Sequence, residues 1–408
     1  MKCRHCAREL QHVFLDLGFA PPSNAYLTPE ALRRPERHFP LRLFVCDACW
    51  LVQTEDYAQA AELFDEDYAY FSSTSKSWVE HAAAYSRMIS ERLSLGPHSR
   101  VLEIAANDGY LLTNFVKAGI PCLGIEPTAS TARAAEQAGV PIVREFFGVG
   151  LAERLVRQGR AFDLVIGNNV FAHVPDINDF TAGIKKVLKP QGTVTLEFPH
   201  LMQLVEQAQF DTVYHEHFSY LSLHAAASIF AAGGLRIFDV EELPTHGGSL
   251  RVYGCHQQDG RTGSRAVDDV LQAEARTGLR DLSTYGSFQG RADALKDDLV
   301  SFLIEQKRQG RSVAGYGAAA KGNTLLNYAG IRPDLLPYIC DAAVSKQGKF
   351  TPGTHIPILP PDVLAQRRPD IVLVLPWNIA DEIAAQQRHL MMAGARFFVA
   401  APELRELE

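Results

Sequence analysis

The stretch Arg100-Val-Leu-Glu-Ile-Ala-Ala-Asn-Asp-Gly109 decides the fold. Its first five residues form a short, mostly apolar run of the kind found in buried strands, and a helical pattern from Tyr110 to Ala118 follows directly. In open parallel sheets, ligands bind at the carboxyl ends of strands, where loops meet helix N-termini. Small residues at 105, 106 and 109 would let a ligand approach the backbone closely. The stretch therefore predicts an α/β domain with a ligand site at the end of this strand.

Short apolar runs alternate with helical stretches after this point, which predicts a parallel sheet with helices on both faces. A helical pattern from Trp78 to Leu95 comes before it. The expected strands are 100–104, 122–126, 162–166, 193–198, 236–240 and 250–254. Helical stretches at 266–280 and 286–309 lead to a second, smaller α/β unit, with strands expected at 312–316, 338–341, 370–375 and 395–400.

Four of the seven cysteines form two Cys-x-x-Cys pairs near the N-terminus. Four thiolates at this spacing favour a closed tetrahedral Zn²⁺ site, and four sulfur ligands leave no open position for catalysis. The predicted structural zinc ligands are Cys3, Cys6, Cys46 and Cys49. We expect a zinc-binding domain at 1–65, whose few apolar residues need the metal to fold, a central domain at 66–245 and a C-terminal α/β domain at 246–408.

The composition of the 408 residues limits the class of protein. The chain is 47% hydrophobic and 21% charged, with a formal net charge of −7, so it can bury sizeable cores and gives no reason to expect nucleic-acid binding. No apolar run approaches the roughly 20 residues that span a bilayer, and the N-terminus is too polar for a secretory signal. We expect a cytoplasmic protein without membrane partners. No heptad or large apolar stripe demands assembly, so we expect a monomer.

Acidic residues fall at the ends of two neighbouring predicted strands. Glu126 can accept hydrogen bonds from both hydroxyls of a ribose. The glycine fingerprint Gly-x-Gly-x-x-Gly of dinucleotide sites is absent from this turn, and Glu103 would repel phosphate but attract an amino group. This unit is therefore predicted to bind a nucleoside that carries an amino group.

Three signatures in this order resemble one family. Glu103-x-Ala-x-Asn-Asp-Gly109, Glu126-Pro127 and Asn168-Asn-Val-Phe-Ala-His173 resemble the glycine-poor variant of class I S-adenosylmethionine-dependent methyltransferases. With the zinc knuckles and the segment Gly315-Tyr-Gly-Ala-Ala-Ala-Lys-Gly-Asn323, essentially the whole chain resembles the nucleotide-sugar C-methyltransferases. That family combines an N-terminal zinc-binding domain with central and C-terminal Rossmann-like domains, and it methylates 4-keto-deoxysugars. One departure is that Ala105 and Ala106 stand where many class I methyltransferases have glycine.

The resemblance implies a set of cofactor-binding residues. The amino-acid half of S-adenosylmethionine would lie among Glu103, Ala105, Asn107 and Gly109, and its ribose would lie at Glu126 and Pro127. Asn168 and Asn169 would approach the sulfonium and the acceptor. The three residues Phe71, Ser72 and Ser73 would fold over the cofactor.

The segment Tyr214-His-Glu-His217 concentrates titratable groups in four residues. The spacing is not the His-Glu-x-x-His of helical zinc sites, so proton transfer is favoured over a second metal. Carbon methylation needs a base beside a ketone, because only the α-proton of a ketone leaves as an enolate, and donors must face the oxyanion.

By resemblance to the family's Tyr-x-Glu-His motif, His217 is the predicted base. Tyr214 and His173 would polarise the enolate oxygen, and Glu216 would orient an imidazole or bind a sugar hydroxyl. Tyr68 or Tyr70 would close over the sugar, and the sequence does not choose between them.

Further acceptor contacts are expected from two loops. The segment from Gly315 to Asn323 follows a strand and opens a helix, a setting that suits anionic oxygens, so Tyr316, Lys321 and Asn323 are candidates for the nucleotide-sugar. The second loop, Thr245 to Arg251, offers His246, Ser249 and Arg251; a flexible interdomain turn is the alternative there.

Two other functions remain open at the level of sequence. One is an NAD-dependent sugar oxidoreductase or epimerase, against which the absent glycine fingerprint and Tyr-x-x-x-Lys pair argue. The other is a non-catalytic zinc-containing binding module, against which the Tyr214–His217 cluster argues. Carbon 3 of a dTDP-linked sugar is the expected methylation site, with carbon 5 as the alternative.

Overall fold

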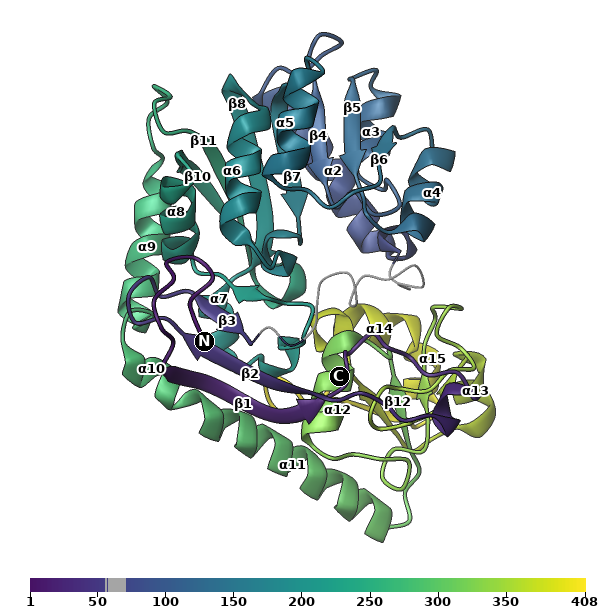
Figure 1. Cartoon of the computed structure of the whole chain (residues 1–408). Helices are drawn as coiled ribbons and strands as arrows, with labels where there is room; N and C mark the ends of the chain where they lie inside the picture. The colour runs from purple at the N-terminus through teal and green to yellow at the C-terminus, as the bar shows by residue number, and fades with distance from the viewer. Residues whose placement is uncertain (56, 58–70) are drawn as a thin grey trace.

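The computed structural model describes residues 1–55, 57 and 71–408, and it contains three sheets (Figure 1). Tyr68 and Tyr70 lie outside the described residues. No helix in the described part of the chain is both long and apolar enough to cross a membrane.

The central sheet has seven strands in the order β10-β11-β8-β7-β4-β5-β6. Its strands are β4 (Val101–Ile104), β5 (Cys122–Ile125), β6 (Ile142–Val143), β7 (Phe162–Asn168), β8 (Leu188–Pro199), β10 (Leu235–Leu243) and β11 (Ser249–His256). The helices of this part are α2 (Lys76–Arg92), α3 (Leu112–Lys117), α4 (Ala129–Gln137), α5 (Val149–Arg157), α6 (Ile177–Val187), α7 (Leu201–Glu206), α8 (Leu223–Ala232) and α9 (Arg265–Thr277). Leu102 packs in one buried cluster and Val101 in another, so alternate residues of β4 face opposite helix layers, as a sheet covered on both faces requires.

The prediction of a wholly parallel sheet is wrong at one edge. Strands β4 to β8 are parallel, but β11 runs antiparallel to β8, and β10 runs antiparallel to β11. Only the short turn η5 (Thr245–Gly247) and its flanks join β10 to β11, and so short a connection permits a hairpin but no parallel crossover. Since β11 belongs to this sheet, the predicted boundary at residue 245 falls inside the hairpin.

The C-terminal unit is a second α/β sheet, as the sequence predicts. Its strand order is β14-β13-β12-β15-β16-β17, with all neighbours parallel except the last pair. The strands are β12 (Val313–Tyr316), β13 (Ile339–Cys340), β14 (Ile358–Leu359), β15 (Ile371–Val374), β16 (Arg396–Val399) and β17 (Arg405–Glu406). The helices are α10 (Leu282–Gly286), α11 (Phe288–Arg308), α12 (Ala320–Tyr328), α13 (Asp362–Arg367), α14 (Ala380–Gln386) and α15 (Arg388–Met392).

The N-terminal residues form a small antiparallel sheet that depends on the rest of the chain. Strands β1 (His12–Ala20), β2 (Phe39–Val45) and β3 (Val52–Thr54) are joined at the edge by β9 (Ser219–Tyr220). Strand β1 lies along α11 (Figure 1), and apolar residues of β1 share one buried cluster with α10, α11 and α12. This segment therefore completes its core with apolar surface of the C-terminal unit.

Candidate active site

The loop after β4 holds an uncommon backbone shape. Ala105, Asn107 and Gly109 have φ values of 59°, 50° and 79°, in the left-handed region that glycine adopts most easily. At Gly109 a Cβ atom would lie 3.0 Å from Val140 and 3.1 Å from Ala135, so glycine is required there. Ala105 adopts a glycine-like conformation with its own side chain present.

Glu126 ties this loop to the next strand. Its Oε2 accepts from the Asn107 backbone N–H at 2.9 Å, and its Oε1 accepts from the Thr128 N–H at 2.9 Å. Burial raises the pKa of Glu126, although these N–H donors favour its ionised form. Each oxygen keeps a lone pair for a further donor. Pro127 lies between Glu126 and Thr128, directly after the end of β5.

Acidic groups crowd the same place. Glu103 is 1% exposed, and burial together with the charges of Glu126 and Asp108 raises its pKa well above the usual range. Neither Oε2 of Glu103 nor Oδ1 of Asp108 has a hydrogen-bond partner in the described structure. Such a group of acids is stabilised by a positive charge.

The turn that follows Phe71 docks onto this loop. The Ser72 N–H donates to Oδ1 of Asn107 and the Ser73 N–H donates to Oδ2 of Asp108, both at 3.0 Å. The structure thus brings the residues predicted to cover the cofactor next to the loop predicted to bind it.

Asn168 and Asn169 end β7. Both side-chain polar atoms of Asn168, and Oδ1 of Asn169, are buried without hydrogen-bond partners in the described residues. Buried amides without partners are costly. Together with the orphaned carboxylate oxygens, they fit a ligand that carries an ammonium group, a sulfonium and a ribose diol, so the residues at this edge fit S-adenosylmethionine.

His217 and His173 are held in matching tautomers. Nδ1 of His217 donates to the Thr212 carbonyl at 3.1 Å, and Nδ1 of His173 donates to the Glu216 carbonyl at 2.8 Å. Burial lowers the pKa of His173 to about 4, and burial plus the neighbouring His173 lowers the pKa of His217 well below its usual value. His217 is therefore neutral at pH 7, and Nε2 carries its lone pair.

The turn at Tyr214 to His217 directs its side chains to different places. The His217 N–H donates to the Tyr214 carbonyl at 3.0 Å, and the two rings lie 4.0 Å apart between centroids. His215 instead contacts the Pro40 carbonyl. The Glu216 carboxylate accepts from Asn24 at 3.1 Å and Ser23 at 3.3 Å, so it is its backbone carbonyl that orients an imidazole.

The C-terminal unit contributes Lys321. Its Nζ donates to Oδ1 of Asn378 at 2.6 Å and lies 4.5 Å from the centre of the Trp377 ring. Burial lowers the pKa of Lys321 to about 8, against the attraction of Asp211. The charge of Lys321 also lowers the pKa values of His217 and His246.

His246 belongs to the same surroundings. Its Nε2 accepts from the Asn169 amide at 3.0 Å, and its ring lies 5.0 Å from that of Trp78. Burial, with the charge of Lys321, lowers its pKa to about 4.

Four of the predicted acceptor-binding residues have partners within the protein. Arg251 pairs with Glu197 at 2.8 Å and Glu241 at 3.1 Å. Ser249 donates to the Thr245 carbonyl at 2.9 Å, and the Asn323 amide donates to the Ser23 carbonyl at 2.7 Å. Tyr316 packs in the buried cluster of the C-terminal sheet. These contacts occupy Nη1 and Nη2 of Arg251, the Ser249 hydroxyl and the Asn323 NH₂ group, whereas Nε of Arg251 and Oδ1 of Asn323 are buried without hydrogen-bond partners in the described residues.

The four N-terminal cysteines converge. Their Sγ atoms all lie within 4.8 Å of one another, with 3.5 Å between Cys3 and Cys49 and between Cys6 and Cys46. Tetrahedral zinc with sulfur at about 2.3 Å separates its ligands by about 3.8 Å, so the set fits zinc.

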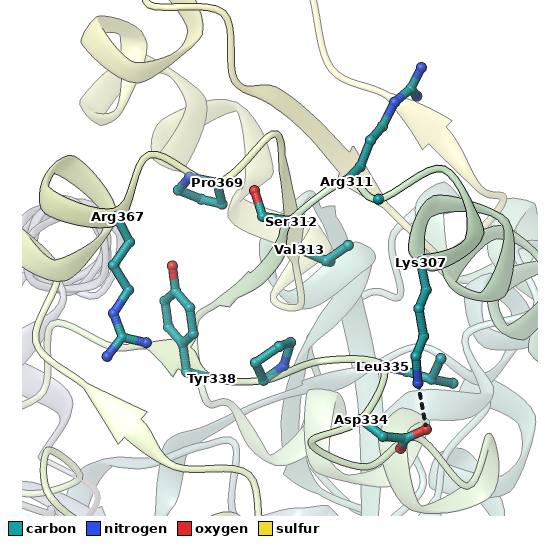
Figure 2. Close-up of a pocket in the computed structure, with 11 residues that line it drawn as sticks. Lys307, Arg311, Ser312, Val313, Asp334, Leu335, Tyr338, Arg367 and Pro369 are labelled. Carbon is teal, nitrogen blue, oxygen red and sulfur yellow. Dashed lines mark hydrogen bonds and ion pairs between the residues drawn. The ribbon is translucent and has the colours of Figure 1, made fainter.

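A hollow of about 380 Å³ lies elsewhere, on the C-terminal unit (Figure 2). Ser312 and Val313, at the amino-terminal start of β12, line it together with Tyr338 and Arg367. None of the predicted site residues lines it, and it lies at the opposite end of the strand from Lys321.

Three segments of the chain match known protein families. Residues 3–64 match the family model of a zinc binding domain, 78–240 that of a methyltransferase domain and 244–402 that of a C-methyltransferase C-terminal domain. The chain is 33% identical over 404 residues to the C-methyltransferase NovU of Streptomyces niveus, over 99% of this chain and 96% of that one. The chain belongs to the C-methyltransferase family. The predicted fold class and enzyme class are thereby confirmed, and neither alternative function finds support among these matches.

Other matches to this C-methyltransferase cover less than half of the chain. The ubiquinone biosynthesis O-methyltransferase of Bartonella bacilliformis is 29% identical over 105 residues, 24% of this chain and 41% of its own. The solved magnesium protoporphyrin IX methyltransferase of Synechocystis PCC 6803, with S-adenosylmethionine bound, is 14% identical with a TM-score of 0.32, covering 44% of this chain and 77% of that one.

Sequence reasoning missed several residues around the site of this C-methyltransferase. The Trp377–Asp211 hydrogen bond connects the C-terminal unit to the segment before the Tyr214–His217 turn, and Asn378 accepts from Lys321 within the C-terminal unit. His81 hydrogen-bonds Glu197 at 3.1 Å. Isolated polar residues of this kind carry no motif. The position of Asp211 three residues before the turn was the only available signal.

Proposed function

We propose that this C-methyltransferase methylates a carbon beside the ketone of a nucleotide-linked 4-keto-deoxysugar, with S-adenosylmethionine as the methyl donor. The observation that carries the proposal is the neutral His217, held by the Thr212 carbonyl so that its Nε2 lone pair is available, beside His173 and Tyr214. A carbon acid needs such a base, whereas a hydroxyl or amine acceptor has its own lone pair.

The chain's residues divide the reaction as follows. Nε2 of His217 removes the α-proton; the electron pair of that C–H bond forms the new C=C bond, and the carbonyl π pair moves onto the ketone oxygen to give an enolate. The Tyr214 hydroxyl donates to the enolate oxygen. Since Nδ1 of His173 donates to the Glu216 carbonyl, the neutral His173 ring has no N–H for the oxyanion, and the Tyr214 hydroxyl is the donor in this scheme.

S-adenosylmethionine supplies an electrophilic methyl group, which the enolate carbon takes as the C–S bond breaks. Glu126 would hold the ribose, and Glu103, Asp108 and Asn168 would face the charged amino-acid half. Lys321, at the start of α12, would meet the diphosphate, because its cation and the helix N-terminus both favour anionic oxygen. A dTDP-linked sugar methylated at C3 is the expected acceptor.

Proton exchange tests the proposal. In D₂O, with a thymidine-diphosphate 4-keto-6-deoxyhexose and no S-adenosylmethionine, wild type should exchange the α-proton, while His217→Asn should not. His98→Asn, an exposed histidine, is the matched control and should exchange as wild type does. Equal exchange by wild type and His217→Asn removes the base assignment. The absence of both exchange and methyl transfer across a panel of keto-sugar nucleotides overturns the substrate class.

A further inference from the structure

The turn that carries His217 is held by side chains of the C-terminal unit. The indole N–H of Trp377 donates to Oδ2 of Asp211 at 2.7 Å, and Oγ1 of Thr324 donates to the Val213 carbonyl at 2.8 Å. These two contacts lie on either side of Thr212, whose carbonyl accepts the Nδ1 proton of His217. The position of that carbonyl therefore depends on residues more than a hundred positions further along the chain.

Burying the carboxyl group of Asp211 for this contact costs free energy. The residue is 0% exposed, and its Oδ1 has no hydrogen-bond partner in the described structure. A buried carboxyl with an oxygen that lacks a partner costs free energy that an apolar side chain would not, so packing alone does not account for it. Burial raises its pKa to about 6, even though Lys321 and the Trp377 N–H favour the ionised form.

Trp377 contacts both Lys321 and Asp211. Its ring carries the Lys321 cation on its face while its N–H reaches Asp211, so the indole fixes Lys321 relative to the turn. A Cβ atom on Gly247 would lie 2.4 Å from the Trp377 ring, which shows how closely the η5 loop of the central sheet packs against it. The indole is thus confined between two parts of the chain.

We propose that Asp211 and Trp377 are positioning residues for His217: their hydrogen bond fixes the Thr212 carbonyl, and that carbonyl holds the imidazole in the tautomer whose Nε2 is the base. This inference rests on the proposed function for its catalytic consequence. The tautomer itself is a property of the protein without substrate.

Four variants separate the roles. Trp377→Phe keeps a ring for Lys321 but removes the N–H. Asp211→Leu removes the acceptor, whereas Asp211→Asn retains a carbonyl oxygen for the indole and is the conservative rescue. Trp50→Phe is the matched control, since Trp50 stacks on Tyr285 at 6.5 Å in a different part of the core.

The first measurement is the tautomer. In protein with ¹⁵N-labelled histidine, the ring nitrogen shifts of His217, assigned by their loss in His217→Asn, should show a protonated Nδ1 in wild type, Asp211→Asn and Trp50→Phe. Trp377→Phe and Asp211→Leu should show a mixture of tautomers. An unchanged Nδ1-protonated ring in both of the latter variants overturns the inference.

The second measurement is α-proton exchange in D₂O. Trp377→Phe and Asp211→Leu should lower kcat at least about tenfold with KM within about threefold, and S-adenosylmethionine affinity should stay as in wild type. A rise in KM at unchanged kcat overturns the inference, because Trp377 would then bind substrate. If wild type does not exchange while the tautomer shifts as expected, the proposed function fails and the positioning role stands.

Discussion

The imidazole rings of His173 and His217 meet edge to face, with 4.6 Å between their centroids. Each donates its Nδ1 proton to a backbone carbonyl of the 210–217 segment, so each keeps an Nε2 lone pair. Two neutral rings can share this space, but two cations could not, because like charges at this distance strongly disfavour each other. One proton can therefore be accepted by this pair at a time.

Acid should destabilise the fold, because the folded protein keeps His173 and His246 neutral at a pH where free histidine is charged. The ordinary pKa of histidine is 6.5, while burial lowers the pKa of His173 to about 4 and, with the charge of Lys321, that of His246 to about 4. Between pH 6.5 and 4 the unfolded chain binds protons that the folded chain does not, so the free energy of unfolding falls as pH falls, by up to about 3 kcal/mol per ring, and levels off below pH 4. Urea unfolding at several pH values measures this slope. A variant with Asn at both positions should show a shallower slope, and an equal slope in that variant and wild type would contradict the assignment.

Removing the charge of Glu126 should weaken cofactor binding. Glu126→Gln loses an ionised acceptor for the ribose hydroxyls, and hydrogen bonds to charged groups contribute roughly 1.5 to 3 kcal/mol, so the Kd for S-adenosylmethionine should rise about 10- to 100-fold. Calorimetric titration measures this. Glu136→Gln is the control, because Glu136 pairs with Arg144 on the surface. An affinity like that of wild type would place the ribose elsewhere.

Arg251 should prove to be a stability residue. Glu197 is 0% exposed and accepts from Arg251, so Arg251→Met leaves a buried carboxylate whose remaining donors among the described residues are His81 and Thr245. Breaking a buried pair in this way costs about 3 to 5 kcal/mol, and Arg251→Met with Glu197→Leu should recover part of it. Chemical denaturation measures both effects. A variant of normal stability with a raised KM for the acceptor would instead return Arg251 to substrate binding.

Local sequence patterns were sufficient to predict some of the strands. The apolar runs at 101–104 and 162–168 became adjacent parallel strands because their hydrophobic length and the helical patterns between them leave few other arrangements. The antiparallel edge could also have been anticipated, since only five residues separate β10 (Leu235–Leu243) from β11 (Ser249–His256).

The hydrogen bonds that position the site residues could not be predicted from local sequence patterns. The motif at 214–217 identifies His217, but nothing in the sequence shows that Ser23 and Asn24 would bond Glu216, or that Trp377 would reach Asp211. These pairs depend on how three sheets pack together. Nor does the sequence show that Arg251 would pair with Glu197 or Asn323 with Ser23, because these partners come from distant segments.

The zinc site should influence catalysis as well as stability. The segment between the two Cys-x-x-Cys pairs carries Ser23 and Asn24, which hold the Glu216 carboxylate, and the Glu216 carbonyl orients His173. Loss of the metal should loosen this segment, since zinc bound by four thiolates contributes folding free energy directly.

Cys6→Ser, or removal of zinc by a chelator, should therefore lower the melting temperature and reduce α-proton exchange together. The reason is that one segment supports both the β1–β2 core and the Glu216 turn. Calorimetry and exchange rates, each alongside measured zinc content, test this, and added Zn²⁺ should restore both properties to the chelated enzyme. Cys122→Ser, outside the cluster, should change neither zinc content nor exchange. A zinc-free enzyme with full stability and wild-type exchange would show that Ser23 and Asn24 are held without the metal, by contacts such as the Asn323–Ser23 hydrogen bond.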